Sequence, residues 1–275
     1  MMAAMTHKGL KAVIGATERI VGRRRLAKVA RLLTSEVRLD GDNIIGENGE
    51  DIVQRVALGF DSPVVFDVGS HFGEWSLSLL SQPGNRPVLH AFEPSAYSTS
   101  HASVALGDRA QVHQVALSDH SGTMELLIVH EGAGSNSLVP FTDTHRPSGE
   151  REQVTVITLD DFCLEQAIDR VTLLKIDAEG HDLAVIKGAQ RMLKTQAIQM
   201  VQFEYNSRWI DARTFLLDAF EVLQGHGYRM GKATPRGIEM YPQWHPELES
   251  FREGNYLAYL PAVETKLPTI PWWGG

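Results

Sequence analysis

The feature that most constrains this chain is an alternation of short apolar runs with helix-spaced segments, which begins at Val64. Such alternation is typical of strands joined by helices, and it predicts a mostly parallel sheet with helices on both faces. We therefore expect a doubly wound, Rossmann-like α/β fold. Strands are expected at 64–68, 87–92, 111–117, 172–176 and 198–205, with 228–230, 238–241 and 256–260 closing the sheet.

Two other features of the pattern modify this sheet. No helix separates 228–230 from 238–241, which predicts an antiparallel edge strand. The runs at 124–129 and 154–157 predict an additional hairpin, with a polar loop between its strands.

The segment before the sheet is basic and amphipathic. Its apolar residues fall at helical spacing from Leu10, which predicts one or two helices over 6–38. Basic residues lie beside the apolar positions, namely Arg23, Arg24, Arg25, Lys28 and Arg31. A solvated helix face explains them most simply. The alternatives are a surface for an anionic substrate, for a partner subunit such as a second copy in a homodimer, or for a membrane.

The composition narrows the class of protein. A chain of 275 residues, 43% of them hydrophobic, is long enough for one large α/β domain. We expect that domain over 51–262, between a helical extension over 1–50 and a C-terminal tail over 263–275. The net charge of −8 disfavours a nucleic-acid partner. The single cysteine excludes an internal disulfide and fits a cytoplasmic setting, and no apolar run is long enough to span a bilayer.

A carboxylate and two glycines lie where the first predicted strand ends. The segment DVGSHFG (67–73) lacks the three-glycine spacing of a dinucleotide site and the Gly-Lys-Ser/Thr of a P-loop. Gly69 permits a sharp turn, and Gly73 lets the next helix pack close to a ligand. Asp67 repels a pyrophosphate and attracts a cationic ligand, such as one with an ammonium and a sulfonium group. The alternative is a plain strand-turn-helix joint with a capping acid.

The next two strand ends supply an acid and an apolar wall. Glu93, followed by Pro94, lies about 20–25 residues beyond the first loop, where an acid accepts hydrogen bonds from ribose hydroxyls. Ala116 and Leu117, followed by Ser118, predict a wall for an adenine ring. A buried strand end with a capped turn is the alternative for this third segment.

Ionisable groups crowd the ends of the fourth and fifth strands. Asp177, Glu179 and His181 follow the run at 172–176, and charges at a buried strand end resist burial unless they bind something. Glu204 is expected beside Asp177 on the neighbouring strand. With the amide oxygen of Asn206, the two carboxylates predict a Mg²⁺ site, because hard cations prefer oxygen ligands. Without a metal, Glu204 is expected to bind substrate hydroxyls.

Four blocks in this order resemble the FkbM family of S-adenosylmethionine (SAM)-dependent methyltransferases. They are FDVGSHFG (66–73), HAFEP (90–94), ALSD (116–119) and IDAEGHD (176–182). The resemblance covers 60–260, and its most specific part is the last block with the KGA (187–189) that follows. Asp182 stands where the family often has Glu.

The resemblance implies a seven-stranded SAM-binding sheet and methyl transfer to a hydroxyl group. It implies that Asp67, Gly69 and Gly73 bind the methionine part of SAM, and that Glu93 binds its ribose. Substrates of the family include sugars, glycolipids and polyketide alcohols. The N-terminal helices lie outside the matching region.

The strand ends and the resemblance together define the expected site. The expected cofactor contacts are Asp67, Gly69, Ser70, Phe72, Gly73, Glu93, Pro94, Ala116, Leu117, Ser118 and Asp177. The expected catalytic residues are Asp177, Glu179, His181, Glu204 and His145, the last on a polar lid segment at 143–146. The magnesium hypothesis uses Asp177, Glu204 and Asn206.

The expected acceptor is a carbohydrate. Acidic and amide groups suit sugar hydroxyls, Tyr205 and Trp209 nearby offer ring faces, and the resemblance implies that sugars are common substrates. A polyketide or another small-molecule alcohol is the alternative acceptor. Two rival functions use the same sheet. A dinucleotide or nucleotide-sugar oxidoreductase is disfavoured by the glycine spacing, and a non-catalytic assembly module leaves the ionisable cluster at 177–181 without a role.

Overall fold

The computed structural model describes residues 7–40, 44–141 and 149–274. It forms two compact units, Met1–Asp40 and Gly41–Gly275. The first unit holds the predicted N-terminal helices, α1 (His7–Val21) and α2 (Arg23–Arg38), and neither contains a buried residue. Within the described ranges, no helix combines the length and the apolarity that a bilayer-spanning segment needs.

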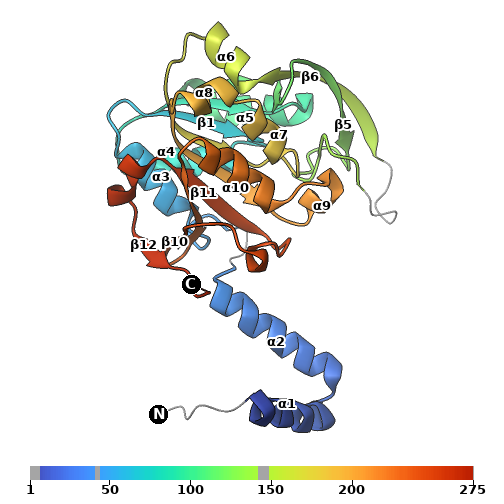
Figure 1. Cartoon of the computed structure of the whole chain (residues 1–275). Helices are drawn as coiled ribbons and strands as arrows, with labels where there is room; N and C mark the ends of the chain where they lie inside the picture. The colour runs from blue at the N-terminus through green and yellow to red at the C-terminus, as the bar shows by residue number, and fades with distance from the viewer. Residues whose placement is uncertain (1–6, 41–43, 142–148, 275) are drawn as a thin grey trace. The chain divides into compact units, whose positions relative to one another are not determined.

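The second unit is built on a nine-stranded sheet (Figure 1). Its strand order is β12-β10-β9-β11-β8-β7-β1-β2-β3. The strands are β1 (Val64–Val68), β2 (Val88–Phe92), β3 (Gln111–His113), β7 (Val171–Ile176), β8 (Ile198–Tyr205), β9 (Arg229–Thr234), β10 (Gly237–Tyr241), β11 (Gly254–Tyr259) and β12 (Thr269–Pro271). Five neighbouring strands, β3, β2, β1, β7 and β8, are parallel. Every residue of β7 is buried, as expected for a strand covered on both faces.

Helices cover both faces of this sheet (Figure 1). The helices of this unit are α3 (Glu50–Leu58), α4 (Glu74–Ser81), α5 (Ala96–Leu106), α6 (Leu159–Glu165), α7 (Asp182–Lys187), α8 (Gln190–Lys194), α9 (Arg208–Ala212) and α10 (Leu216–Gly225). From β1 the chain moves outward through α4 to β2, and from β7 it moves the opposite way through α7 and α8 to β8. Right-handed crossovers then place the two sets of helices on opposite faces. The predicted doubly wound α/β fold is confirmed.

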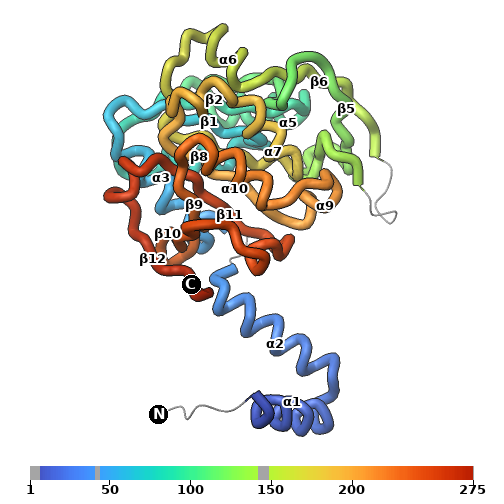
Figure 2. Tube along the Cα trace, in the orientation of Figure 1, coloured from blue at the N-terminus to red at the C-terminus, as the bar shows by residue number. Residues whose placement is uncertain are grey.

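The structure differs from the prediction in the details of the sheet. It has nine strands instead of seven. The predicted antiparallel pairing near the edge is found between β9 and β10, and β11 is also antiparallel but lies inside the sheet, between β8 and β9. The edge strand is β12, which pairs in parallel with β10. Figure 2 shows how β8 to β12, in orange and red, continue the sheet from β1 and β2. The division into residues 1–50, 51–262 and 263–275 stays a prediction.

A second, three-stranded sheet has the order β4-β6-β5. Strands β5 (Gly122–Ile128) and β6 (Glu150–Thr158) form the predicted hairpin, and β4 (Ala116–Ser118) pairs in parallel with β6. The single strand expected at 111–117 is therefore divided between two sheets. His113 and Ala116 belong to different sheets because the chain turns at 114–115, where Val115 N donates back to His113 O at 2.9 Å.

A buried ion pair joins β1 and β7 of the main sheet. Asp67 on β1 and Lys175 on β7 are lateral neighbours, with side chains that are 0% and 4% exposed. Lys175 Nζ lies 2.9 Å from Asp67 Oδ1, and Ser76 Oγ donates to Asp67 Oδ2 at 2.6 Å. Burial alone lowers the pKa of Lys175, but the carboxylates of Asp67, Asp177 and Glu50 raise it above its usual value. The two charges therefore stabilise each other where neither is tolerated alone.

Replacement of Lys175 should destabilise the fold because it leaves the Asp67 carboxylate buried without its ion-pair partner. We expect Lys175→Met to lower the free energy of unfolding by about 3–5 kcal/mol in urea denaturation. Lys187→Met, at an exposed position of α7, is the matched control and should be nearly neutral. The double variant Asp67→Asn/Lys175→Met should recover part of the loss. Equal stability of the Lys175 and Lys187 variants would contradict this role.

Candidate active site

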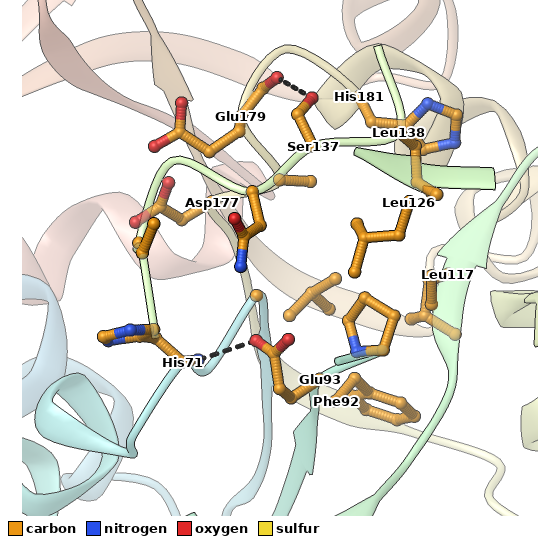
Figure 3. A pocket seen from close by; sticks show the side chains of 18 residues that line it. His71, Phe92, Glu93, Leu117, Leu126, Ser137, Leu138, Asp177, Glu179 and His181 are labelled. Carbon is orange, nitrogen blue, oxygen red and sulfur yellow. Dashed lines mark hydrogen bonds between the residues drawn. The ribbon is translucent and has the colours of Figure 1, made fainter. Parts of the chain in front are cut away.

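A pocket opens at the carboxyl ends of β1 and β7, where the chain leaves the sheet in opposite directions (Figure 3). It has about 570 Å³ of space, part of it open to solvent. Ligands of open parallel sheets bind in the crevice at such a switch point. The ends of β1, β2 and β7, strand β4, and the segment 133–138 after β5 supply the lining residues.

The walls of the pocket differ in polarity. In Figure 3, Asp177 and Glu179 lie on one side, and Leu117, Leu126 and Leu138 lie on the other. The acids follow β7, whereas the leucines come from β4, β5 and the segment after β5. The pocket therefore suits a ligand with a cationic end and a flat apolar end.

The turn after β1 is held by two neighbouring strand ends. The backbone N–H groups of Gly69 and Ser70 both donate to Phe92 O at 3.0 Å, and Asp177 N donates to Val68 O at 3.0 Å. Gly69 has a φ of +74°, and a Cβ built on it would lie 1.8 Å from Asp177 O. Only glycine fits this turn without a shift of the backbone.

Two other pocket residues have the left-handed backbone conformation without being glycine. His71 and Glu179 both have a φ of 50°. His71 Nε2 donates to Gly132 O at 3.0 Å, which ties the β1 turn to the segment after β5. Such conformations cost energy and cluster at binding sites, where the surrounding structure maintains them.

Glu93 lies at the base of the pocket, below Asp177 in Figure 3. Its side chain accepts hydrogen bonds from the backbone of His71 at 3.0 Å and of Ser95 at 2.9 Å. The residue is 8% exposed, and burial raises its pKa to about 7. Because two backbone donors already orient this carboxylate, it is preorganised to accept hydrogen bonds from a ligand.

His181 closes the pocket on the apolar side. Its Nε2 lies 2.9 Å from Ser118 Oγ, so the start of α7 contacts the end of β4. Burial lowers the pKa of His181 to about 4, and the imidazole is therefore neutral at neutral pH. Asp182, the next residue, accepts hydrogen bonds from the backbone of Ala178 and Gly180 and shapes the turn that carries the acids.

The Ser137 hydroxyl group connects the segment after β5 to the turn that carries Glu179. Ser137 Oγ donates to Glu179 O at 2.8 Å and accepts from Val139 N at 2.9 Å. Arg208, at the start of α9, donates to Ser137 Oγ at 3.0 Å and to Val139 O at 2.7 Å. Parts of the chain far apart in sequence thus meet at Ser137.

The family model described as the methyltransferase FkbM domain matches residues 67–230, more than half of the chain. The chain belongs to the FkbM methyltransferase domain family. The resemblance predicted from the four sequence blocks is confirmed. The matched region contains β2, β4, β7 and the carboxyl end of β1, which contribute to the pocket.

Two curated proteins are moderately similar to this chain in sequence. The chain is 27% identical over 157 residues to "Methyltransferase sdnD" of Sordaria araneosa, a match of 46% of this chain and 60% of that protein. It is 25% identical over 194 residues to "31-O-demethyl-FK506 methyltransferase FkbM" of Streptomyces tacrolimicus, a match of 60% of this chain and 72% of that protein. The chain thus spans less than two thirds of the first relative.

Among solved structures, the crystal structure of Methyltransferase FkbM from Methylobacillus flagellatus KT is similar to this chain. The identity is 17%, the TM-score is 0.45, and the match covers 72% of this chain and 44% of that chain. A SAM-dependent methyltransferase from Aquifex aeolicus matches with 13% identity and a TM-score of 0.41, over 82% of this chain and 98% of that chain.

The predicted site residues of this FkbM-domain chain fall into two groups. Those that line the pocket are Gly69, Glu93, Pro94, Ala116, Leu117, Asp177, Glu179 and His181. Those that do not line it are Asp67, Ser70, Phe72, Gly73, Ser118, Glu204 and Asn206. His145 lies outside the described residues. Asp67 is engaged with Lys175, and Gly73 lies beside Leu106 of α5.

Glu204 and Asn206 interact with each other. Asn206 Nδ2 donates to Glu204 Oε2 at 2.5 Å, and Asn206 Oδ1 accepts from Arg208 N at 2.8 Å. Burial raises the pKa of Glu204, and Asp177 and Asp182 raise it further. Across residues 7–40, 44–141 and 149–274, no group of three or more His, Cys, Asp or Glu side chains is arranged to hold a metal ion.

Tyr205 and Trp209 do not offer ring faces to a ligand, contrary to the prediction. Both side chains are fully buried. The Tyr205 hydroxyl donates to Glu249 at 2.7 Å, and Trp209 Nε1 donates to Glu204 O at 2.9 Å. The prediction was wrong because the end of β8 is covered by α9 and by the segment before β11.

Several pocket residues were not predicted. His71 and Phe92 line the pocket and lie within the blocks 66–73 and 90–94 that resemble the FkbM family. Their residue types alone do not distinguish them from their neighbours as ligand contacts. Leu126 and the residues at 133–138 belong to a hairpin that the sequence placed beside the main fold. The glycines at 132 and 134 are typical of a turn between the two strands of the hairpin. They do not indicate that this turn folds over the pocket.

The contact of Gly69 with Asp177 can be tested by adding a methyl group. In Gly69→Ala, the alanine must adopt a left-handed backbone conformation, and its Cβ clashes with Asp177 O. We therefore expect the free energy of unfolding to fall by about 2 kcal/mol or more. Gly134→Ala is the matched control, because it also lines the pocket but has no heavy atom within 4 Å of the added Cβ. Thermal and urea unfolding measure both variants. Similar stability of the two variants would refute the proposed contact.

Proposed function

We propose that the chain is a SAM-dependent methyltransferase that methylates a hydroxyl group. The observation that carries the proposal is a pocket at the switch point of an FkbM domain, with acids on one side and leucines on the other. SAM has a sulfonium and an ammonium group at one end and a flat adenine ring at the other. This distribution of charge matches the walls of the pocket.

The residues of the pocket suggest how SAM is held. Glu93 is positioned to accept hydrogen bonds from the ribose hydroxyls, with Leu117 and Leu126 beside the adenine ring. Asp177 and Glu179 face the cationic end. Asp67 supports this arrangement from within the sheet, through Lys175, whose Nζ also lies 3.7 Å from Asp177 Oδ2.

Bound SAM supplies a methyl group on a sulfonium sulfur. In the transfer, the S–CH₃ bond breaks, an O–CH₃ bond forms, and the hydroxyl proton passes to a base. An enzyme speeds such a displacement chiefly by alignment of the acceptor oxygen, and a base contributes further. Besides Glu93, which we assign to the ribose, Asp177 and Glu179 are carboxylates that line the pocket. A Mg²⁺ ion held by Asp177, Glu204 and Asn206 is the alternative activator and stays a prediction, as do the homodimer and the cytoplasmic setting.

A carbohydrate remains the acceptor class predicted from the sequence. The burial of Tyr205 and Trp209 removes one support for that prediction, the ring faces for stacking, whereas the acids of the pocket still suit sugar hydroxyls. A small-molecule alcohol is the second candidate. It is favoured by the apolar wall and by the relative named 31-O-demethyl-FK506 methyltransferase.

SAM binding should depend on the ionisation of Glu93. Burial holds the pKa of this acid at about 7, and its carboxylate form accepts hydrogen bonds from ribose hydroxyls. Affinity should therefore rise about tenfold from pH 6 to pH 8, as the proton leaves. Calorimetry of wild type and Glu93→Gln measures this, and the variant should bind weakly with a flatter profile. Identical pH profiles would rule out this role for Glu93.

A role for Glu179 as base predicts a selective loss of turnover. Glu179→Gln should bind SAM within about threefold of wild type and lose about 100-fold or more in turnover. Glu165→Gln, at an exposed position of α6, is the matched control. The assay follows SAM consumption with panels of sugars and small-molecule alcohols, with added Mg²⁺ or with EDTA. No SAM binding by wild type would refute the proposed function, and loss in EDTA alone would favour the metal alternative.

A further inference from the structure

Charge is divided unequally between the two units of the chain. Residues 1–40 contain nine Lys or Arg and three Asp or Glu, a net charge of +6. The other 235 residues carry −14, which gives the total of −8. The positive charge is thus concentrated in α1, α2 and their flanks, and the methyltransferase activity proposed above assigns it no role.

Large apolar side chains are concentrated on the same two helices. Of the 17 exposed large hydrophobic residues among those described, nine lie here: Leu10, Val13, Ile14, Ile20, Val21, Val29, Leu32, Leu33 and Val37. Exposed apolar faces of this extent mark an interaction surface.

Each helix separates the two kinds of side chain. On α2, Val29, Leu33 and Val37 follow one another at intervals of four residues and share one face. Arg24, Lys28, Arg31 and Arg38 occupy the opposite side of the helix at similar intervals. On α1, Leu10, Val13 and Ile14 share a face, away from Lys8 and Lys11.

We propose that α1 and α2 bind the surface of an anionic membrane, with their aliphatic faces inserted at the acyl-chain boundary and their basic faces at the lipid headgroups. Helices that lie in this interface have one apolar face, one basic face and a length too short or too polar to span. Negative lipid headgroups complement the +6 charge. The acidic second unit adds no attraction of its own, so the binding must come from residues 7–38.

Other partners match these helices less well. In a dimer formed through these helices, two identical +6 segments would lie against each other, and their like charges would repel. A nucleic acid would pair with the basic residues but leave nine aliphatic side chains in water. A membrane surface is the partner that uses both faces.

The test uses the full-length protein and vesicles. We expect the protein to float with vesicles of 70% phosphatidylcholine and 30% phosphatidylglycerol in 0.1 M NaCl. The bound fraction should be at least tenfold lower with vesicles of phosphatidylcholine alone. The charge variant Lys28→Glu/Arg31→Glu should lose at least tenfold in binding, whereas Lys187→Glu/Lys194→Glu, exposed on the second unit, should bind normally. The apolar variant Val29→Ser/Leu33→Ser should also lose binding, and its matched control is Val104→Ser/Leu164→Ser.

Circular dichroism and SAM binding, measured for every variant, verify that the fold is kept. Equal binding to both vesicle types, or an equal loss in a variant and its control, would overturn the proposal. A protein that binds no vesicles and sediments as a dimer, with the dimer lost in Val29→Ser/Leu33→Ser, would overturn the proposal. The partner of these helices would then be a second copy of the chain. These outcomes do not depend on turnover, so they separate this proposal from the catalytic one.

Discussion

The ion pair between Asp67 and Lys175 is the contact on which the rest of the second unit depends. It joins β1 to β7 at the point where the chain leaves the sheet in opposite directions. Two residues beyond Asp67 is Gly69, and two residues beyond Lys175 is Asp177. The pair therefore fixes the relative position of the two turns that form the polar side of the pocket. A buried pair of this kind adds little net stability, but it determines which residues face each other across the crevice.

Long-range contacts then complete the pocket from outside the parallel sheet. Ser137 connects the segment after β5 to the backbone of Glu179 and to the guanidinium group of Arg208. His181 connects the start of α7 to Ser118 of β4. Each contact fixes a different wall, and together they maintain the left-handed backbone of Glu179 between them. The preorganised shape of the pocket comes from these contacts as much as from the sheet itself.

The sequence predicted the parts of the site that depend on local pattern. The strand ends at Glu93 and Asp177 follow from apolar runs, and both residues line the pocket. Gly188 was recognised only as part of a family block, and the structure explains it, since a Cβ there would lie 2.0 Å from Ser118 O. Burial was the property that local pattern did not reveal. Asp67 and Tyr205 have types suited to ligand contact, but they are buried against Lys175 and Glu249, which are distant in sequence. Trp209 is buried at the end of β8, where it donates to Glu204 O.

The three-stranded sheet has a consequence for the diversification of such proteins. It carries Leu117 and Leu126, whereas the acids Asp177 and Glu179 follow β7 of the large sheet. The hairpin of β5 and β6 can therefore lengthen, shorten or change its side chains without disturbing the parallel strands. Changes in this hairpin would alter the apolar wall, including the side chains placed beside the adenine ring, while the acids that follow β7 keep their positions. The two walls of one pocket can in this way diverge independently of each other.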